Sequence, residues 1–204
     1  MSTSATLAAT SGENLLVTGD PMVGKRSFVF DVAADAVSNG RDVLVVTAAV
    51  GADRLPAALR ESRNLTVVDC SPGSSEAVGS VTTVSTPGDL TGVSMPVSRF
   101  LSSANSPVVL VDSISTLLLY AEEAPVFRFL SVLTAHVRRS GGLGLYTLDE
   151  GCHTEQTFRT FVQLFDGEVG LRAADATPSA GVSPTEVRVR GLDAFDGEWR
   201  PESE

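Results

Sequence analysis

The sequence contains almost no lysine: Lys25 is the only lysine among the 15 lysine and arginine residues of this 204-residue chain. The formal net charge is -10, and the acidic residues are spread along the chain instead of forming a tail. Phosphate contacts with nucleic acids need clustered Lys and Arg, whereas basic runs here are no longer than two residues, as in Arg138-Arg139. The composition therefore argues against a large nucleic-acid interface.

Loss of lysine together with dispersed Asp and Glu indicates adaptation to high salt. Surface carboxylates hold water and cations there, and their repulsion is screened over a few Å. An ordinary acidic cytosolic protein is the alternative, although acidity alone does not remove lysine. We therefore expect a halophilic protein.

Cysteine and long apolar runs are also scarce. Cys70 and Cys152 are isolated and lack metal-ligand spacing, which is typical of a reduced, intracellular chain. The longest apolar runs fall far below the ~18 residues of a membrane span. Residues 1–12 have neither the basic nor the apolar region of a signal peptide. We expect a cytoplasmic protein that does not contact a membrane.

Apolar strands alternate with amphipathic helices over most of the chain. This alternation predicts a mostly parallel sheet covered by helices on both faces. A short apolar run at 15–17 precedes a glycine-rich turn and a helix at 26–38. Further strands are expected at 43–47, 65–69, 107–112 and 144–148, and further helices at 52–63, 93–103, 115–120, 124–139 and 154–165.

The C-terminal part changes character, because short alternating segments there flank a loop rich in Pro, Gly and Ser. Residues 167–191 are therefore predicted to form an antiparallel hairpin at one edge of the sheet. We expect one domain over residues 13–200, with a flexible N-terminus at 1–12, a loop insertion at 71–92 and a tail at 201–204.

The lysine lies in a glycine-rich turn between the first strand and the first helix. Glycines there allow consecutive N–H groups to face inward as an anion nest, at the positive end of the helix. The lysine would reach β- and γ-phosphate oxygens. An ordinary βα turn is the alternative reading. The predicted nucleotide-binding residues are Gly19, Asp20, Pro21, Met22, Val23, Gly24, Lys25, Arg26 and Ser27.

Asp112 ends a strongly apolar strand and should lie at the same sheet edge as this turn. A carboxylate there can hold the hydration shell of Mg²⁺ opposite the phosphates. Its alternative role is to cap the following helix. We therefore assign Lys25 and Asp112 as candidate catalytic residues and Asp112 as a candidate Mg²⁺ residue.

Arg26 departs from the usual pattern, because this position normally presents a hydroxyl to Mg²⁺. Ser27 follows, rotated by about 100° around the helix, and could replace that hydroxyl only if the loop shifted. Arg26 could instead pair with phosphate directly and reduce the need for metal. The metal ligands to test are Ser27 and Asp112.

The loop and the Asp112 strand together resemble the RecA superfamily, in particular the KaiC-like ATPases of archaea and their haloarchaeal, transducer-like group. The resemblance spans about Asn14 to Trp199 and implies a RecA-like P-loop core that binds ATP and Mg²⁺. The similar stretches are Gly19–Lys25, Ser85–Gly92, Val108–Leu118, Val126–Leu130 and Leu164–Gly167.

In that family two adjacent glutamates typically follow the second strand, and one of them activates water. Ala49 and Val50 occupy these positions here, and neither can accept a proton. Asp53 lies about one helical turn beyond, and the pair Glu122-Glu123 is expected to be a solvated helix end. The chain retains groups that bind phosphate and lacks those that polarise water.

Other candidates carry weaker chemistry. His136 falls within a predicted helix and is expected to be structural. Asp149 and His153 follow a strand at the nucleotide edge and could sense a γ-phosphate. Phe127 and Phe129 have helical spacing, which favours the core over base stacking.

The leading hypothesis is an ATP-binding regulatory or signalling module with little or no hydrolysis, in effect a pseudo-ATPase. RecA-like sites often lie between protomers, so a homo-oligomer or another protein partner is expected. A slow ATPase completed across a subunit interface and an interaction scaffold without nucleotide are the alternatives. A DNA role ranks last because of the charge.

Overall fold

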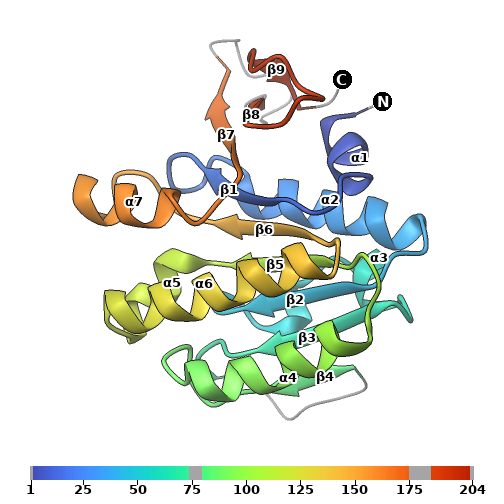
Figure 1. Ribbon diagram of the computed structural model, residues 1–204, viewed down its shortest axis with the longest axis vertical. Coiled ribbons are helices and arrows are strands. Elements are labelled where there is room, and N and C mark those ends of the chain that lie inside the picture. Colours follow the sequence, from blue (N-terminus) through green and yellow to red (C-terminus); the bar gives the residue numbers. More distant parts are fainter. Residues whose placement is uncertain (1, 74–79, 175–184, 203–204) are drawn as a thin grey trace.

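The chain builds one large, mostly parallel sheet with helices on both faces (Figure 1). The structure is a computed structural model that describes residues 2–73, 80–174 and 185–202. Within these residues the strand order is β4-β3-β2-β5-β6-β1-β7-β8-β9. The strands are β1 (Asn14–Thr18), β2 (Val43–Thr47), β3 (Leu65–Asp69), β4 (Val81–Thr83), β5 (Val108–Asp112), β6 (Leu143–Thr147), β7 (Gly167–Ala173), β8 (Thr185–Arg190) and β9 (Arg200–Pro201).

Strands β1 to β7 are parallel, and β8 and β9 continue the sheet in antiparallel pairing. The predicted C-terminal hairpin is therefore confirmed as β7 and β8. The helices are α1 (Thr3–Ala8), α2 (Lys25–Ser38), the 3₁₀ turn η1 (Ala52–Arg54), α3 (Ala57–Arg60), α4 (Leu90–Ser103), α5 (Ile114–Tyr120), α6 (Glu123–Arg139) and α7 (Glu155–Val162).

Two apolar cores fill the two faces of the sheet. In β5, Val108 and Leu110 pack into the core of α1, α2 and α3, whereas Val109 and Val111 pack into the core of α4 to α7. Successive side chains of a strand point to opposite faces, so a central strand between two helical layers needs apolar residues at every position. This geometry explains the continuous apolar runs in the sequence. Phe129 and the partly buried Phe127 belong to the second core, as expected.

The helix predicted over 52–63 is not continuous. Its place is taken by the single turns η1 and α3, separated at Pro56. Leu55, directly before this proline, is extended at φ -65° and ψ 147°. A residue before proline is driven out of the helical region by contact with the proline ring. Helical spacing of apolar residues was misleading here because it continued across a proline.

The N-terminal residues also differ from the flexible segment expected at 1–12. They form α1, in which Leu7 and Ala8 are buried against α2. The Ser4 hydroxyl donates to Asp35 of α2 at 2.8 Å, and Arg41 donates to the carbonyl oxygen of Ala8. One large apolar side chain gave little periodic signal in the sequence, although its tertiary contacts hold the helix in place.

The segment 71–92, expected as a loop insertion, contributes structure of its own. Its residues 74–79 lie outside the described part, but Val81–Thr83 form the edge strand β4, parallel to β3. Asp89 caps α4, whose first residue is Leu90. In the described residues no helix is long and apolar enough to cross a membrane.

Candidate functional site

The glycine-rich turn links β1 to α2 at the carboxyl edge of the sheet. Gly24 has a left-handed backbone (φ +101°) and precedes the first residue of α2. At Gly19 the φ is +141°, and an added Cβ would meet the Leu171 carbonyl oxygen of β7 at 2.4 Å. Only glycine fits there, since both the backbone angle and the close approach of β7 exclude a side chain. The turn is therefore held tightly against the neighbouring strand.

Lys25 begins α2 and is almost completely buried, with 6% of its surface exposed. Its ammonium group donates to the carbonyl oxygens of Gly19 and Asp20 at 2.7 and 2.6 Å. It also forms an ion pair with Asp149 Oδ1 at 2.9 Å. An ammonium group has three donors, so the three oxygens satisfy the lysine. The ammonium thus lies curled back over the loop, beside a carboxylate that follows β6.

The N-terminus of α2 has an unusual charge. Gly24 gives α2 no side-chain cap, and α6, which also lacks one, has the acidic Glu123 in its first turn. The first turn of α2 has no acidic residue and begins with Lys25 and Arg26. The start of a helix carries partial positive charge and unpaired N–H groups, so cations there are unfavourable unless an anion accompanies them. This end of α2 is electrostatically suited to an anion.

Arg26 does not follow Lys25 into the loop but points to the end of β5. Its Nε donates to Asp112 Oδ2 at 2.6 Å, and the second carboxylate oxygen of Asp112 accepts from Thr147 Oγ1 at 3.0 Å. The arginine side chain is 44% exposed and the aspartate side chain 4% exposed. Ser113, not Asp112, caps α5. The carboxylate is therefore left to neutralise an arginine.

These contacts do not fit the Mg²⁺ site expected from the resemblance. The hydroxyl position of the loop is an arginine, and the candidate carboxylate already faces a guanidinium and a hydroxyl. Ser27 is exposed on α2. In the parts of the chain that the structure describes, no group of three His, Cys, Asp or Glu residues is placed to hold a metal ion.

At the end of β2, where the KaiC-like ATPases typically have two glutamates, the loop is held by the carboxylate of Asp69. Asp69 Oδ2 accepts from the Ala52 N–H at 2.7 Å, and its Oδ1 accepts from the N–H and the hydroxyl of Ser71 at 2.9 and 2.7 Å. Asp53 is 78% exposed and pairs loosely with Arg54. Burial, helped by the charge of Asp69, raises the pKa of the Cys70 thiol to about 12. The hydrogen bonds of the Asp69 carboxylate at the end of β2 are therefore all made to neighbouring loops of the same chain.

Asp149 and His153 come together with α5 through one hydroxyl. The Asp149 N–H donates to Ser115 Oγ at 2.9 Å, and His153 Nε2 lies 2.8 Å from the same oxygen. Ser115 is buried. This arrangement fixes the chain after β6 and so positions the Asp149 carboxylate next to Lys25.

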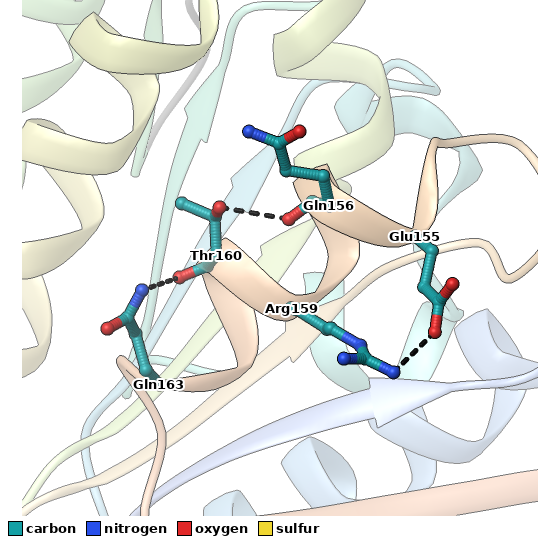
Figure 2. A pocket seen from close by; sticks show the side chains of 5 residues that line it. All are labelled: Glu155, Gln156, Arg159, Thr160 and Gln163. Carbon is teal, nitrogen blue, oxygen red and sulfur yellow. Dashed lines mark hydrogen bonds and ion pairs between the residues drawn. The ribbon is translucent and has the colours of Figure 1, made fainter.

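A surface hollow with a volume of about 470 Å³ lies elsewhere, along the outer face of α7. Figure 2 shows five lining residues of this one helix and the interactions between them. Arg159 pairs with Glu155, Gln163 donates to the Thr160 carbonyl, and Thr160 donates to the Gln156 carbonyl. Because these residues lie on one face of a single helix and their hydrogen bonds stay within that helix, we regard the hollow as a helix surface and not as a binding site.

Of the residues predicted for the site, the structure brings Lys25, Arg26 and Asp112 to one edge of three neighbouring strands, β5, β6 and β1. It leaves Ser27 exposed, and Glu122 and Glu123 are an exposed helix start, as expected. The sequence did not predict that Thr147 would donate to Asp112 or that Ser115 would accept from the Asp149 N–H. The order of the strands was the missing information, because it is what places β6 between β1 and β5.

The architecture and the position of the loop define the class: this is a RecA-like fold. A solved structure with a similar fold is the KaiC-like protein PH0186 from the hyperthermophilic archaeon Pyrococcus horikoshii OT3, with a TM-score of 0.69 and 16% identity over 94% of this chain and 84% of that chain. The model of the family of unknown function DUF7504 matches residues 12–171. The chain belongs to this family. No curated protein matches it.

Proposed function

We propose that this protein binds ATP in the loop from Gly19 to Ser27 and works as a regulatory or signalling module with little or no hydrolysis. The observation that carries the proposal is the buried Lys25 at the uncapped start of a 14-residue helix, with Arg26 next to it. Asp149 and Asp112 each balance one of these charges, and the positive end of the helix dipole beside them favours a further anion. The RecA-like fold makes a nucleotide the appropriate anion.

The absence of glutamates after β2 supports binding without turnover. Ala49 and Val50 have no titratable group, and Asp69, the buried carboxylate nearby, is engaged by three donors. A general base must reach the attacking water and have a free lone pair. We therefore expect a nucleotide that is sensed and not consumed.

Composition and fold support further parts of the proposal. The single lysine and the net charge of -10 suit a haloarchaeal protein of a salt-rich cytoplasm. The residues 13–200 would act as one domain. A second copy of the chain or another protein would bind preferentially to the ATP-bound form, as in RecA-like assemblies that place sites between protomers.

The test uses the single lysine as a reporter. Protein labelled only in lysine with ¹³C and ¹⁵N gives side-chain NMR signals from Lys25 alone. Titration with ATP in molar KCl should shift the Nζ signal, and calorimetry should show that Lys25→Ala weakens ATP binding by about 100-fold. Arg60→Ala, which removes an exposed cation on α3, is the matched control and should bind as wild type does.

Equal, negligible binding by wild type and Lys25→Ala would overturn the proposal and favour the interaction scaffold. Phosphate release is measured on the same samples. Turnover above background that disappears in Lys25→Ala would instead favour a slow ATPase completed across a subunit interface.

A further inference from the structure

The pair formed by Arg26 and Asp112 occupies the place where a metal ion would be expected. Asp112 ends β5, and Arg26 lies in the first turn of α2, directly after the loop lysine. The Nε–Oδ2 distance of 2.6 Å is that of a charge-assisted hydrogen bond. The charge of this buried carboxylate is therefore neutralised within the chain.

The remaining donors of Arg26 are free to bind a ligand. In the described residues Nε is the one atom of the guanidinium with a partner, so both terminal NH₂ groups remain available. The side chain is 44% exposed at the edge where the loop opens. A planar guanidinium with two free NH₂ groups matches the spacing of phosphate oxygens. One arginine can thus contact Asp112 and a phosphate at once.

A divalent cation would have to displace this guanidinium. It would approach a carboxylate that is already paired at both oxygens, beside two fixed positive charges, Lys25 and Arg26. A cation bound next to Lys25 and Arg26 would be repelled by both, and burial reduces the screening of this repulsion by salt. The usual hydroxyl ligand is absent because Arg26 stands in its position. Both the charge and the ligands therefore disfavour a metal.

We infer that Arg26 takes the place of Mg²⁺, so that the site binds the metal-free nucleoside triphosphate. This inference rests on the proposed function and specifies the ionic form of its ligand. Lys25 and Arg26 together balance charge on the phosphates, and Asp112 holds Arg26 in position. The protein would then respond to free ATP and not to the magnesium complex.

The experiment measures ATP binding by calorimetry in molar KCl, once with excess MgCl₂ and once with EDTA. Wild type should bind at least as tightly with EDTA as with MgCl₂, because magnesium sequesters the free ligand. Arg26→Ser restores the hydroxyl and removes the competing cation, so its binding should become tighter with MgCl₂ than with EDTA. Arg60→Ser is the control for loss of one positive charge and should behave as wild type does.

A second variant covers the case in which Arg26→Ser does not fold, since it leaves Asp112 buried without its partner. Asp112→Asn keeps an oxygen that accepts from Arg26 Nε and removes the carboxylate that a metal would need, so its ATP affinities with EDTA and with MgCl₂ should have the same ratio as those of wild type. Paramagnetic resonance of Mn²⁺ gives an independent readout. Wild type with ATP should bind no more Mn²⁺ than ATP does alone.

The outcomes separate this inference from the proposed function. Wild-type binding that is at least tenfold weaker in EDTA than in MgCl₂ overturns the replacement of the metal and leaves ATP binding intact. Extra Mn²⁺ held by the wild-type complex overturns it as well. Failure of wild type to bind ATP under both conditions overturns the proposed function itself.

Discussion

The carboxyl ends of β1 and β2 lie on the same edge of the sheet (Figure 1) but differ in the charged groups that they carry. At the end of β1, Lys25 and Arg26 gather opposite Asp149 and Asp112. At the end of β2 the chain is apolar, and a buried Asp69 is fully engaged in holding the loop. One end has groups that a ligand could engage, whereas the other has groups that only the fold needs. The difference is the one that the proposed function requires, namely groups for binding at the end of β1 and no free base at the end of β2.

The largest effect is expected from Gly19→Ala at the β1 end. The new methyl group would meet the Leu171 carbonyl oxygen at 2.4 Å, and φ is +141°. We expect a loss of more than about 3 kcal/mol in the free energy of unfolding, measured by denaturant titration in molar KCl. Gly12→Ala is the control, because Gly12 has φ +82° with nothing near its Cβ. Its cost should be about 1 kcal/mol, and equal losses in both variants would contradict the close approach of β7.

The next effect tests the β2 end through Asp69→Ala. This change leaves the N–H groups of Ala52 and Ser71 and the Ser71 hydroxyl without their acceptor. Unsatisfied buried donors should lower the free energy of unfolding by about 2 kcal/mol, again measured by denaturant titration. ATP affinity of the folded protein should not change.

Asp53→Ala is the matched control for Asp69→Ala, since Asp53 is 78% exposed at the same end of the sheet. Its effect on the free energy of unfolding should stay within about 0.5 kcal/mol. A loss of ATP binding in Asp69→Ala at unchanged stability would break the comparison, because it would assign a ligand contact to the β2 end.

The smallest effect is expected from Asp149→Asn, which sharpens the description of the β1 end. The carboxylate pairs with Lys25 at 2.9 Å and is 31% exposed, so it competes with phosphate for the ammonium. Removing its charge should tighten ATP binding about fivefold, measured by calorimetry, because a partly exposed ion pair contributes about 1 kcal/mol. Glu150→Gln removes the same charge one residue later and should change the affinity little. Weaker binding in Asp149→Asn would show that the carboxylate assists the ligand.

Much of the fold could be predicted from the sequence, because both apolar faces of a parallel strand must be covered. The runs at β2 and β5 carried this signal without ambiguity. The prediction of one continuous helix over 52–63 was wrong because it followed the apolar spacing and ignored Pro56. α1 was missed since Leu7 alone supplied its periodicity, whereas its packing on α2 supplied its stability.

The loop could be predicted residue by residue, because its glycines and lysine are consecutive in the chain. The pairing of Arg26 with Asp112 could not, since 86 residues separate them. Arg26 was predicted to lie at the phosphates, and nothing in the local sequence showed which carboxylate it would contact. The engagement of Asp149 by Lys25 was likewise not predictable, because it depends on β6 lying beside β1.

The sequence by itself determined the layered sheet, the glycine-rich loop at the start of α2 and the absence of glutamates after β2, because each of these is written in consecutive residues. Only the tertiary structure decided how the charges of the loop are satisfied. Strand order brings the ends of β5, β6 and β1 together, and the distances between charges across those ends decide which carboxylate neutralises which cation. Electrostatic pairing depends on separation in space, which the spacing of residues along the chain does not contain.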